Sequence, residues 1–264
     1  MKYKFDSEQH LHELDKGSGF KPLTGTSSVG NVLAKNLVWW AAELSAVECL
    51  EVGEKIPTIR EEYETACKSS DKKKAIDALQ KKYPLFKKAR FAHFDKKNKT
   101  AEAGTDLHQE LEDYVKAMMK LKPVRKYDSK IQPFINWADE NVKKFIASEA
   151  HCFDEELWVG GIVDCVAELN DGKLAIIDFK SSKEAYPTQF LQAAGYAIQV
   201  EQNGLFSEDG EHSKTLEGKI EVLIVVPFGA EVVEPSVRLD IESYKQGFRS
   251  AVVLYRLLGL EKTN

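Results

Sequence analysis

The reversal at Asn170-Asp171-Gly172 constrains the fold of this chain more than any other stretch of its sequence. Two runs rich in apolar and β-branched residues, 157–169 and 173–180, flank it. An Asp-Gly pair between such runs is typical of a tight β-hairpin turn, because glycine supplies the positive φ that the turn needs. We therefore predict an antiparallel hairpin in which residues equally far from Asp171 face each other.

This pairing places Asp164 directly opposite Asp178. Opposite residues share a face of the sheet, with their Cβ atoms about 5 Å apart. Two carboxylates so placed repel each other unless something compensates them, and a hard divalent cation such as Mg²⁺ prefers such oxygen ligands. Because side chains alternate along a strand, Lys180 lies on the face of Asp178, and Phe179 points to the core. A β-bulge would shift this register by one residue.

Taken alone, Asp178-Phe179-Lys180 is more typical of an ordinary surface ion pair than of a catalytic motif. Two neighbouring features favour a functional site. Ile176-Ile177 are too apolar for an exposed strand, so we expect Asp178 at the end of a buried one. Gly160-Gly161 permit the close approach of another part of the backbone.

The first half of the sequence is predicted to be largely helical. Residues 1–22 are expected to be irregular or weakly paired. A helix is expected from Val29 to about Leu50, with Ser27 or Ser28 as its N-cap. The further helical segments are 57–99, broken at Pro84; 104–121, opened by Gly104-Thr105 and ended by Pro123; and 133–149, which fits either a helix or a helix followed by a strand.

The second half of the sequence alternates strands and helices. After the hairpin it predicts a helix at Pro187–Gln202, a buried strand at Lys219–Pro227, an edge strand at Val232–Leu239 and an amphipathic helix at 241–260. This order indicates an α/β or α+β core, in which a central mixed β-sheet is flanked by helices. We expect a helical N-terminal region at 1–100, packed on a core at 101–264.

Charge is distributed unevenly along the chain. The net charge is −5, yet between Lys68 and Lys99 twelve Lys and Arg residues stand against three acidic ones. Such a run fits a solvated helical face, and it also fits an arm that binds phosphates. Under the second interpretation, Lys72, Lys73 and Lys74 are candidate DNA-binding residues. Four aromatic residues interleave with these lysines and either stack on bases or pin the segment to the core: Tyr83, Phe86, Phe91 and Phe94.

The cysteines and the start of the chain argue against several classes of protein. Cys49, Cys67, Cys152 and Cys165 form no CxxC pair, so no zinc site or iron–sulfur cluster is predicted. No apolar run reaches the length of a membrane span, and the N-terminus lacks the apolar region of a secretory signal. A cytoplasmic protein without a membrane partner is therefore expected.

Five short patterns occur in one order along the chain: Gly104-x-x-x-His108, Glu149, Gly161-x-x-Asp164, Asp178-x-Lys180 and Gln192-x-x-x-Tyr196. Alone, His108 fits a core histidine, Glu149 a solvated acid, Gln192 a residue of a helix surface and Tyr196 a core aromatic. Together, the patterns resemble the PD-(D/E)XK nuclease superfamily, specifically its RecB-like branch, which includes phage-type exonucleases. The resemblance covers roughly residues 100–240, and a weaker likeness extends to residues 24–40.

The resemblance implies a restriction-endonuclease-like core with a metal site. His108, Asp164 and Asp178 would hold Mg²⁺ or Mn²⁺, with the carbonyl of Phe179 as a further ligand. Glu149 would take part in catalysis by supporting the metal or the shell of residues that faces DNA. The implied chemistry is attack of metal-activated water on a phosphodiester, in which the metal neutralises developing negative charge.

The resemblance also implies roles for three residues that hold no metal. Lys180 would orient or help to deprotonate the attacking water and would stabilise the charged transition state. Gln192 and Tyr196 lie one turn apart on a helix face and would position the DNA backbone.

The expected function is therefore that of an Mg²⁺- or Mn²⁺-dependent DNA exonuclease in recombination, repair or phage DNA metabolism. Single-stranded or resected ends are the favoured substrate, in a bacterial or phage-infected cell. A recombination partner protein and a homo-oligomer are compatible with the resemblance. Two alternatives stay open: a catalytically idle nuclease-like module that binds DNA, and an endonuclease.

Overall fold

The computed structural model describes residues 1–33, 56–228 and 234–260, and it divides the chain into two compact units. Unit 1 comprises Met1–Ala34 and Gly104–Asn264, and unit 2 comprises Lys35–Ala103. The long helix α5 (Pro84–Met118) contributes residues to both units. Each unit is described by itself.

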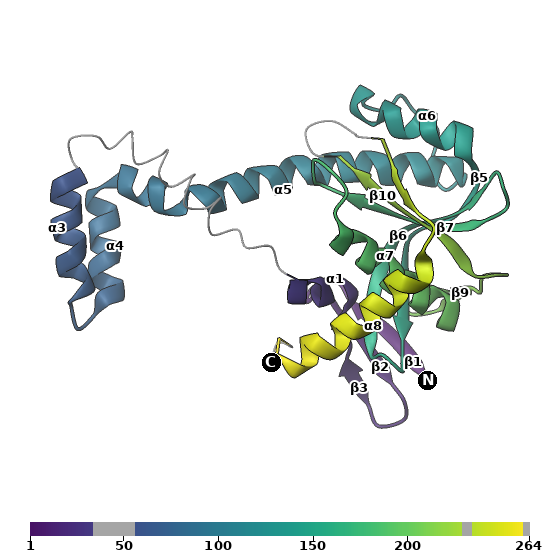
Figure 1. The fold of residues 1–264 in the computed structure, drawn as a ribbon, viewed down its shortest axis with the longest axis horizontal. Helices are drawn as coiled ribbons and strands as arrows, with labels where there is room; N and C mark the ends of the chain where they lie inside the picture. The colour runs from purple at the N-terminus through teal and green to yellow at the C-terminus, as the bar shows by residue number, and fades with distance from the viewer. Residues whose placement is uncertain (34–55, 229–233, 261–264) are drawn as a thin grey trace. The chain divides into compact units, whose positions relative to one another are not determined.

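A mixed β-sheet forms the centre of unit 1, as the sequence predicts (Figure 1). Its strand order is β11-β10-β7-β6-β5-β8-β9, and β4 pairs with β6 in addition. Strands β7 and β10 are parallel, and β5, β6 and β7 form an antiparallel meander. The strands are β4 (Thr24–Gly25), β5 (Val142–Asp154), β6 (Val159–Leu169), β7 (Leu174–Lys180), β8 (Leu205–Phe206), β9 (His212–Lys214), β10 (Ile220–Pro227) and β11 (Ser236–Arg238).

Helices cover both faces of this sheet (Figure 1). On one face, the C-terminal part of α5, the 3-10 helix η3 (Ser129–Ile131) and α6 (Gln132–Asn141) bury side chains such as Leu111 and Phe134. On the other face lies α7 (Pro187–Asn203), and α8 (Ile241–Leu257) packs against α7, where Gly195 makes room for Phe248. Burial of both faces explains why β7 and β10 read as nearly continuous apolar runs.

The hairpin of β6 and β7 has the predicted register. Cys165 pairs with Ile177 and Ala167 pairs with Ala175, so residues equally far from Asp171 face each other. Gly172 has a φ of 86° and donates its N–H to the carbonyl of Leu169, as a tight turn requires.

The N-terminal residues differ from the prediction of an irregular start. Strands β1 (Lys2–Asp6), β2 (Leu11–Asp15) and β3 (Phe20–Pro22) form a separate antiparallel sheet. Few apolar residues mark these strands, and they are held by tertiary contacts that sequence periodicity does not reveal. Tyr3, Leu14 and Leu23 bury against Phe153 of β5. The predicted helical region 1–100 is therefore corrected: its first 33 residues pack with the core as strands and short helices.

The predicted helix from Val29 to Leu50 lies mostly outside the described residues. Its described start is made of a short helix, α1 (Thr26–Val29), which begins before Val29, and of the 3-10 helix η1 (Gly30–Leu33). The prediction of a serine N-cap is wrong, because the N-cap is Gly25 and makes no side-chain capping hydrogen bond. The side chain of Thr26 instead donates to the carbonyl of Gly160.

Unit 2 contains α3 (Ile56–Cys67), α4 (Lys72–Lys82) and the first part of α5, and α3 and α4 lie side by side (Figure 1). The break at Pro84 is confirmed, because α5 begins there. The predicted helix start at Gly104 is wrong, because α5 runs on through it; a glycine inside a helix costs only about 1 kcal/mol. The helix ends at Met118, before Pro123, because Lys120 adopts a positive φ of 62° that closes the last turn.

The segment predicted as a helix or a helix followed by a strand takes the second form, with α6 followed by β5. The predicted edge strand at 232–239 is described only from residue 234 onward, and there it is shortened to β11. Among the described residues, no helix is both long enough and apolar enough to cross a membrane.

Candidate metal centre

Three carboxylates stand in one row across three neighbouring strands of unit 1. Glu149 of β5 lies between two paired positions, Ser148 with Cys165 and Ala150 with Val163, so it faces Asp164 of β6. Asp164 in turn occupies the position that follows the last β6–β7 pair, next to Asp178 of β7. The row thus places acidic groups from separate parts of the sequence side by side.

The sheet opens at this row. The β6–β7 ladder ends at Cys165 and Ile177, whereas β7 remains paired with β10 as far as Lys180. Beyond the last pair, the backbone N–H of Phe179 donates to Oδ2 of Asp164 at 2.7 Å. Where the backbone pairing of β6 and β7 has ended, the side chain of Asp164 therefore accepts a hydrogen bond from the backbone of β7.

His108 reaches this opening from α5. Its Nε2 lies 3.6 Å from Oδ2 of Asp164, and its ring contacts the rings of Phe179 and Phe228, with centroids 5.8 and 6.0 Å apart. One ligand atom each from His108, Glu149 and Asp164 lie within 4.8 Å of one another. An imidazole and two carboxylates at this spacing are a donor set that fits a divalent cation.

Glu149 is held in a strained and partly buried position, unlike a solvated acid. It has a positive φ of 50°, which is uncommon outside glycine and asparagine. Its Oε1 is buried without a hydrogen-bond partner in the described part of the chain. Burial, and after it the charge of Asp164, raise the pKa of Glu149 to about 7. Such a carboxyl is a group that a bound cation would stabilise in its ionised form.

Asp178 and Lys180 form an ion pair at the end of β7. Lys180 Nζ lies 2.7 Å from Oδ1 of Asp178, while Oδ2 of Asp178 is buried and has no hydrogen-bond partner among the described residues. Asp178 is fully buried, and burial is the main reason why its pKa is raised to about 7. Asp178 is not among the three residues whose ligand atoms lie within 4.8 Å of one another. The structure therefore brings the predicted ligands together only in part.

The remaining charges of the site favour ionised groups. Burial alone would raise the pKa of Asp164, but the His108 imidazole and the Lys180 ammonium outweigh it and hold the pKa below its usual range. Burial alone would lower the pKa of His108, but Asp164 and then Glu149 raise it. The pKa of Lys180 is likewise raised, because Asp178 and Asp164 outweigh the effect of burial.

Gln192 and Tyr196 of α7 contact each other as their spacing predicts. Gln192 Nε2 donates to the hydroxyl of Tyr196 at 2.8 Å. Burial, followed by the charges of Asp178 and Asp164, raises the pKa of Tyr196 well above its usual value, so its hydroxyl is protonated. Gly161 makes this packing possible, because a Cβ there would lie 2.7 Å from Cε1 of Tyr196. The predicted close approach at Gly161 is thus made by side chains.

Lys72, Lys73 and Lys74 are exposed at the start of α4 in unit 2. Sequence reasoning missed two charged neighbours of the site in unit 1, Glu112 and Lys116. Glu112 follows His108 by one turn of α5 and forms an ion pair with Lys116 one turn further on, and both charges act on Glu149. The spacing of four residues after His108 was the signal that could have found Glu112.

Neither a family model nor a curated protein matches the chain. The fit of a divalent cation therefore rests on the donor set itself: one imidazole, neighbouring carboxylates, and two buried carboxylate oxygens without partners.

Proposed function

We propose that this chain is a divalent-metal-dependent nuclease that hydrolyses phosphodiester bonds in DNA. The observation that carries the proposal is the pair of buried carboxylate oxygens without partners, Glu149 Oε1 and Asp178 Oδ2. They stand on either side of Asp164, with His108 and Lys180 beside the row. Buried charges of one sign are costly unless a counter-charge joins them.

In this proposal, the core is restriction-endonuclease-like and belongs to the RecB-like branch of the PD-(D/E)XK superfamily. His108, Glu149 and Asp164 would hold Mg²⁺ or Mn²⁺, with Asp178 and the Phe179 carbonyl as further ligands. When bound, such a cation polarises a phosphoryl oxygen and lowers the pKa of water.

The protein's own residues would bind and orient the reacting groups. The Lys180 ammonium lies at the strand end and would stabilise negative charge on the phosphate as it develops. Its ion pair with Asp178 keeps it protonated and fixes its direction. The amide of Gln192, oriented by Tyr196, would position a phosphate oxygen of the DNA backbone.

The proposed mode is exonuclease action on DNA ends, because the residue patterns resemble those of phage-type exonucleases. Single-stranded or resected ends are the proposed substrate, in recombination, repair or phage DNA metabolism. An endonuclease would share the same site chemistry, and an idle module would bind DNA without cutting it.

Digestion of end-labelled DNA tests the proposal. Linear single-stranded, linear double-stranded and closed circular DNA are incubated with the protein in Mg²⁺, Mn²⁺ or EDTA. We expect cation-dependent loss of linear DNA, and loss of this activity in Asp178→Asn. The matched control is Asp171→Asn, an exposed aspartate on the same hairpin, which should keep wild-type activity. Cutting of closed circles would favour the endonuclease, and binding without cutting would favour the idle module.

A further inference from the structure

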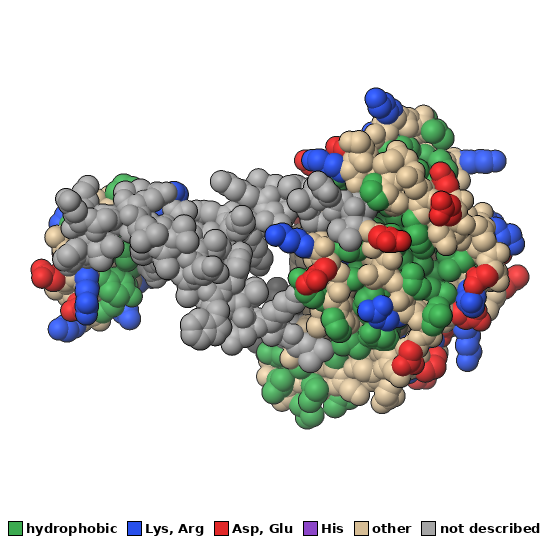
Figure 2. Space-filling view, turned by 45° about the horizontal axis from the view of Figure 1, so that its top comes forward, with side chains coloured by type: hydrophobic (Ala, Val, Ile, Leu, Met, Phe, Trp, Pro, Cys, Tyr) green, Lys and Arg blue, Asp and Glu red, His purple; other side chains and the backbone are tan. Residues whose placement is uncertain are grey.

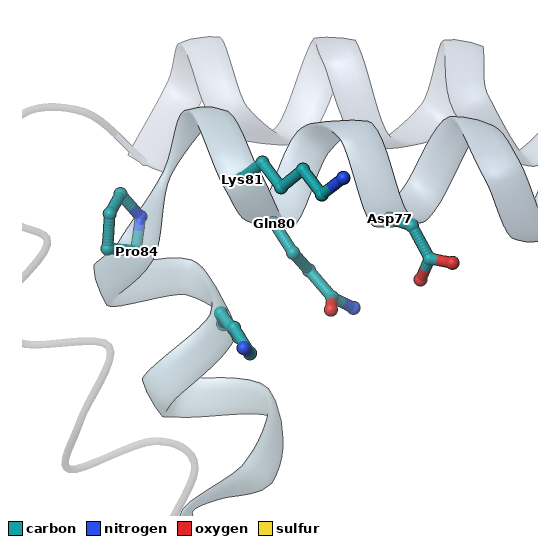
Figure 3. Close-up of a pocket in the computed structure, with 5 residues that line it drawn as sticks. Asp77, Gln80, Lys81 and Pro84 are labelled. Atoms are coloured by element: carbon teal, nitrogen blue, oxygen red, sulfur yellow. The ribbon is translucent and has the colours of Figure 1, made fainter.

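A cleft of about 460 Å³ lies in unit 2, at the corner where α4 meets the first turns of α5. Figure 3 shows Pro84 at the corner and the side chains of Asp77 and Gln80 on the same side of α4. The cleft exists because Pro84 starts a new helix axis instead of continuing α4. The lining residues are Asp77, Gln80, Lys81, Pro84 and Lys87.

Gln80 is the uncharged polar side chain that lines the cleft. Gln80 is only 8 % exposed, and its side-chain amide forms no hydrogen bond with another described residue. Its amide is not among the buried side-chain atoms without a partner, so the amide reaches the open space of the cleft. An amide that lines a cleft in this state can donate to a ligand that brings its own acceptor oxygens.

Lysines give the cleft its charge. Lys81 and Lys87 are exposed, and neither forms an ion pair with any residue that the structure describes. Lys74 lies two turns before Lys81 on the same face of α4. Figure 2 shows Lys and Arg side chains on several sides of the described surface of unit 2, with fewer acidic ones. Between Lys68 and Lys88, eight lysines stand against two aspartates, although the whole chain is acidic.

We propose that this cleft is an auxiliary subsite for the phosphodiester backbone of a nucleic acid. Lys81 and Lys87 pair with phosphate oxygens, and the Gln80 amide donates a hydrogen bond to one of them. Asp77, the acid in the cleft, limits the affinity. The choice of a nucleic acid over other polyanions rests on the proposed nuclease function, whereas the preference for a polyanion rests on the cleft alone.

The test is a binding measurement on the full chain in EDTA, where metal-dependent cleavage cannot occur. A labelled oligonucleotide, single-stranded or duplex, is titrated by fluorescence anisotropy at several salt concentrations. We expect Lys81→Gln/Lys87→Gln to weaken binding about tenfold at low salt. The slope of log affinity against log salt should fall by about 1.5, at about 0.7 to 0.9 for each lost phosphate contact.

Two further variants test whether the charge of the cleft determines the affinity and whether the effect is confined to this cleft. Asp77→Asn removes the acid from the cleft and should tighten binding about two- to fivefold by relieving repulsion of phosphate. Lys130→Gln, an exposed lysine of unit 1, should bind as wild type does. All substituted side chains are exposed, so circular dichroism should show an unchanged fold.

Several outcomes would overturn the proposal. Wild-type affinity and slope in the double variant would do so, as would weaker binding in Asp77→Asn. So would labelled polyglutamate binding as tightly as the oligonucleotide, which would assign the cleft to an acidic polypeptide. Because cleavage is measured separately, a chain that binds through this cleft and cuts nothing would refute only the nuclease proposal.

Discussion

The substitution Glu149→Gln should stabilise the protein at alkaline pH while impairing the proposed site. Burial and the neighbouring Asp164 raise the pKa of Glu149 from 4.5 to about 7. Each tenfold change in an ionisation constant corresponds to about 1.4 kcal/mol. The ionised carboxylate therefore lowers the free energy of unfolding by about 3 kcal/mol relative to a neutral side chain of the same shape.

The sign of the effect depends on pH. Below about pH 4.5, Glu149 is protonated in both the folded and the unfolded chain, so glutamate and glutamine should be equivalent. Between pH 4.5 and about 7, the unfolded chain releases the proton while the folded chain keeps it, so the stability of the wild type falls as pH rises. Above about pH 7 the difference should stay constant.

Urea denaturation in EDTA measures this difference, at pH 4 and at pH 8.5. We expect Glu149→Gln to exceed the wild type by about 3 kcal/mol at pH 8.5 and by less than about 0.5 kcal/mol at pH 4. Glu221→Gln, an exposed glutamate on β10, is the control and should change neither value by more than about 0.5 kcal/mol. Equal stability of Glu149→Gln and wild type at pH 8.5 would refute the argument from burial.

Three further predictions concern the same site. Lys180→Gln should lower the single-turnover cleavage rate by about 10²- to 10³-fold. Its cation affinity should be unchanged in a calorimetric titration. A wild-type rate would show that Lys180 takes no part in the reaction. His108→Ala should weaken Mn²⁺ binding by at least about tenfold, and unchanged binding would place the cation elsewhere. Gly161→Ala should lower the free energy of unfolding by about 1 to 3 kcal/mol, because its Cβ would meet Tyr196. Thermal denaturation measures this loss. The control is Gly30→Ala, because a Cβ at Gly30 would meet no atom within 4 Å.

The hairpin was predictable because its signals are local. The turn at Asp171-Gly172 and the apolar runs beside it determine the register, and the structure has that register. The alternation of strands and helices after residue 142 likewise gives the mixed sheet. Burial of both sheet faces was less evident, because an apolar run in the sequence does not say which helix will cover it.

Features that depend on distant contacts were not predictable. The sheet of β1, β2 and β3 is held by side chains such as Tyr3 and Leu14 packing on Phe153. The place of Glu149 opposite Asp164 requires the β5–β6 register, and no local sequence signal marks its positive φ. Because single residues at Gly104 and Pro123 are weak signals, the predicted start and end of the helix that carries His108 were both misplaced.

The row of acids across β5, β6 and β7 has a consequence for the order in which parts of the chain fold. Its members come from positions 149, 164 and 178, His108 comes from a helix before them, and β10 must arrive before β7 has its second neighbour. A nascent or proteolysed chain that ends before β10 therefore contains every member of the site but leaves β7 without the strand that pairs with it beyond the β6–β7 ladder. A cation that binds at the completed site would stabilise the fully folded chain relative to partly folded forms.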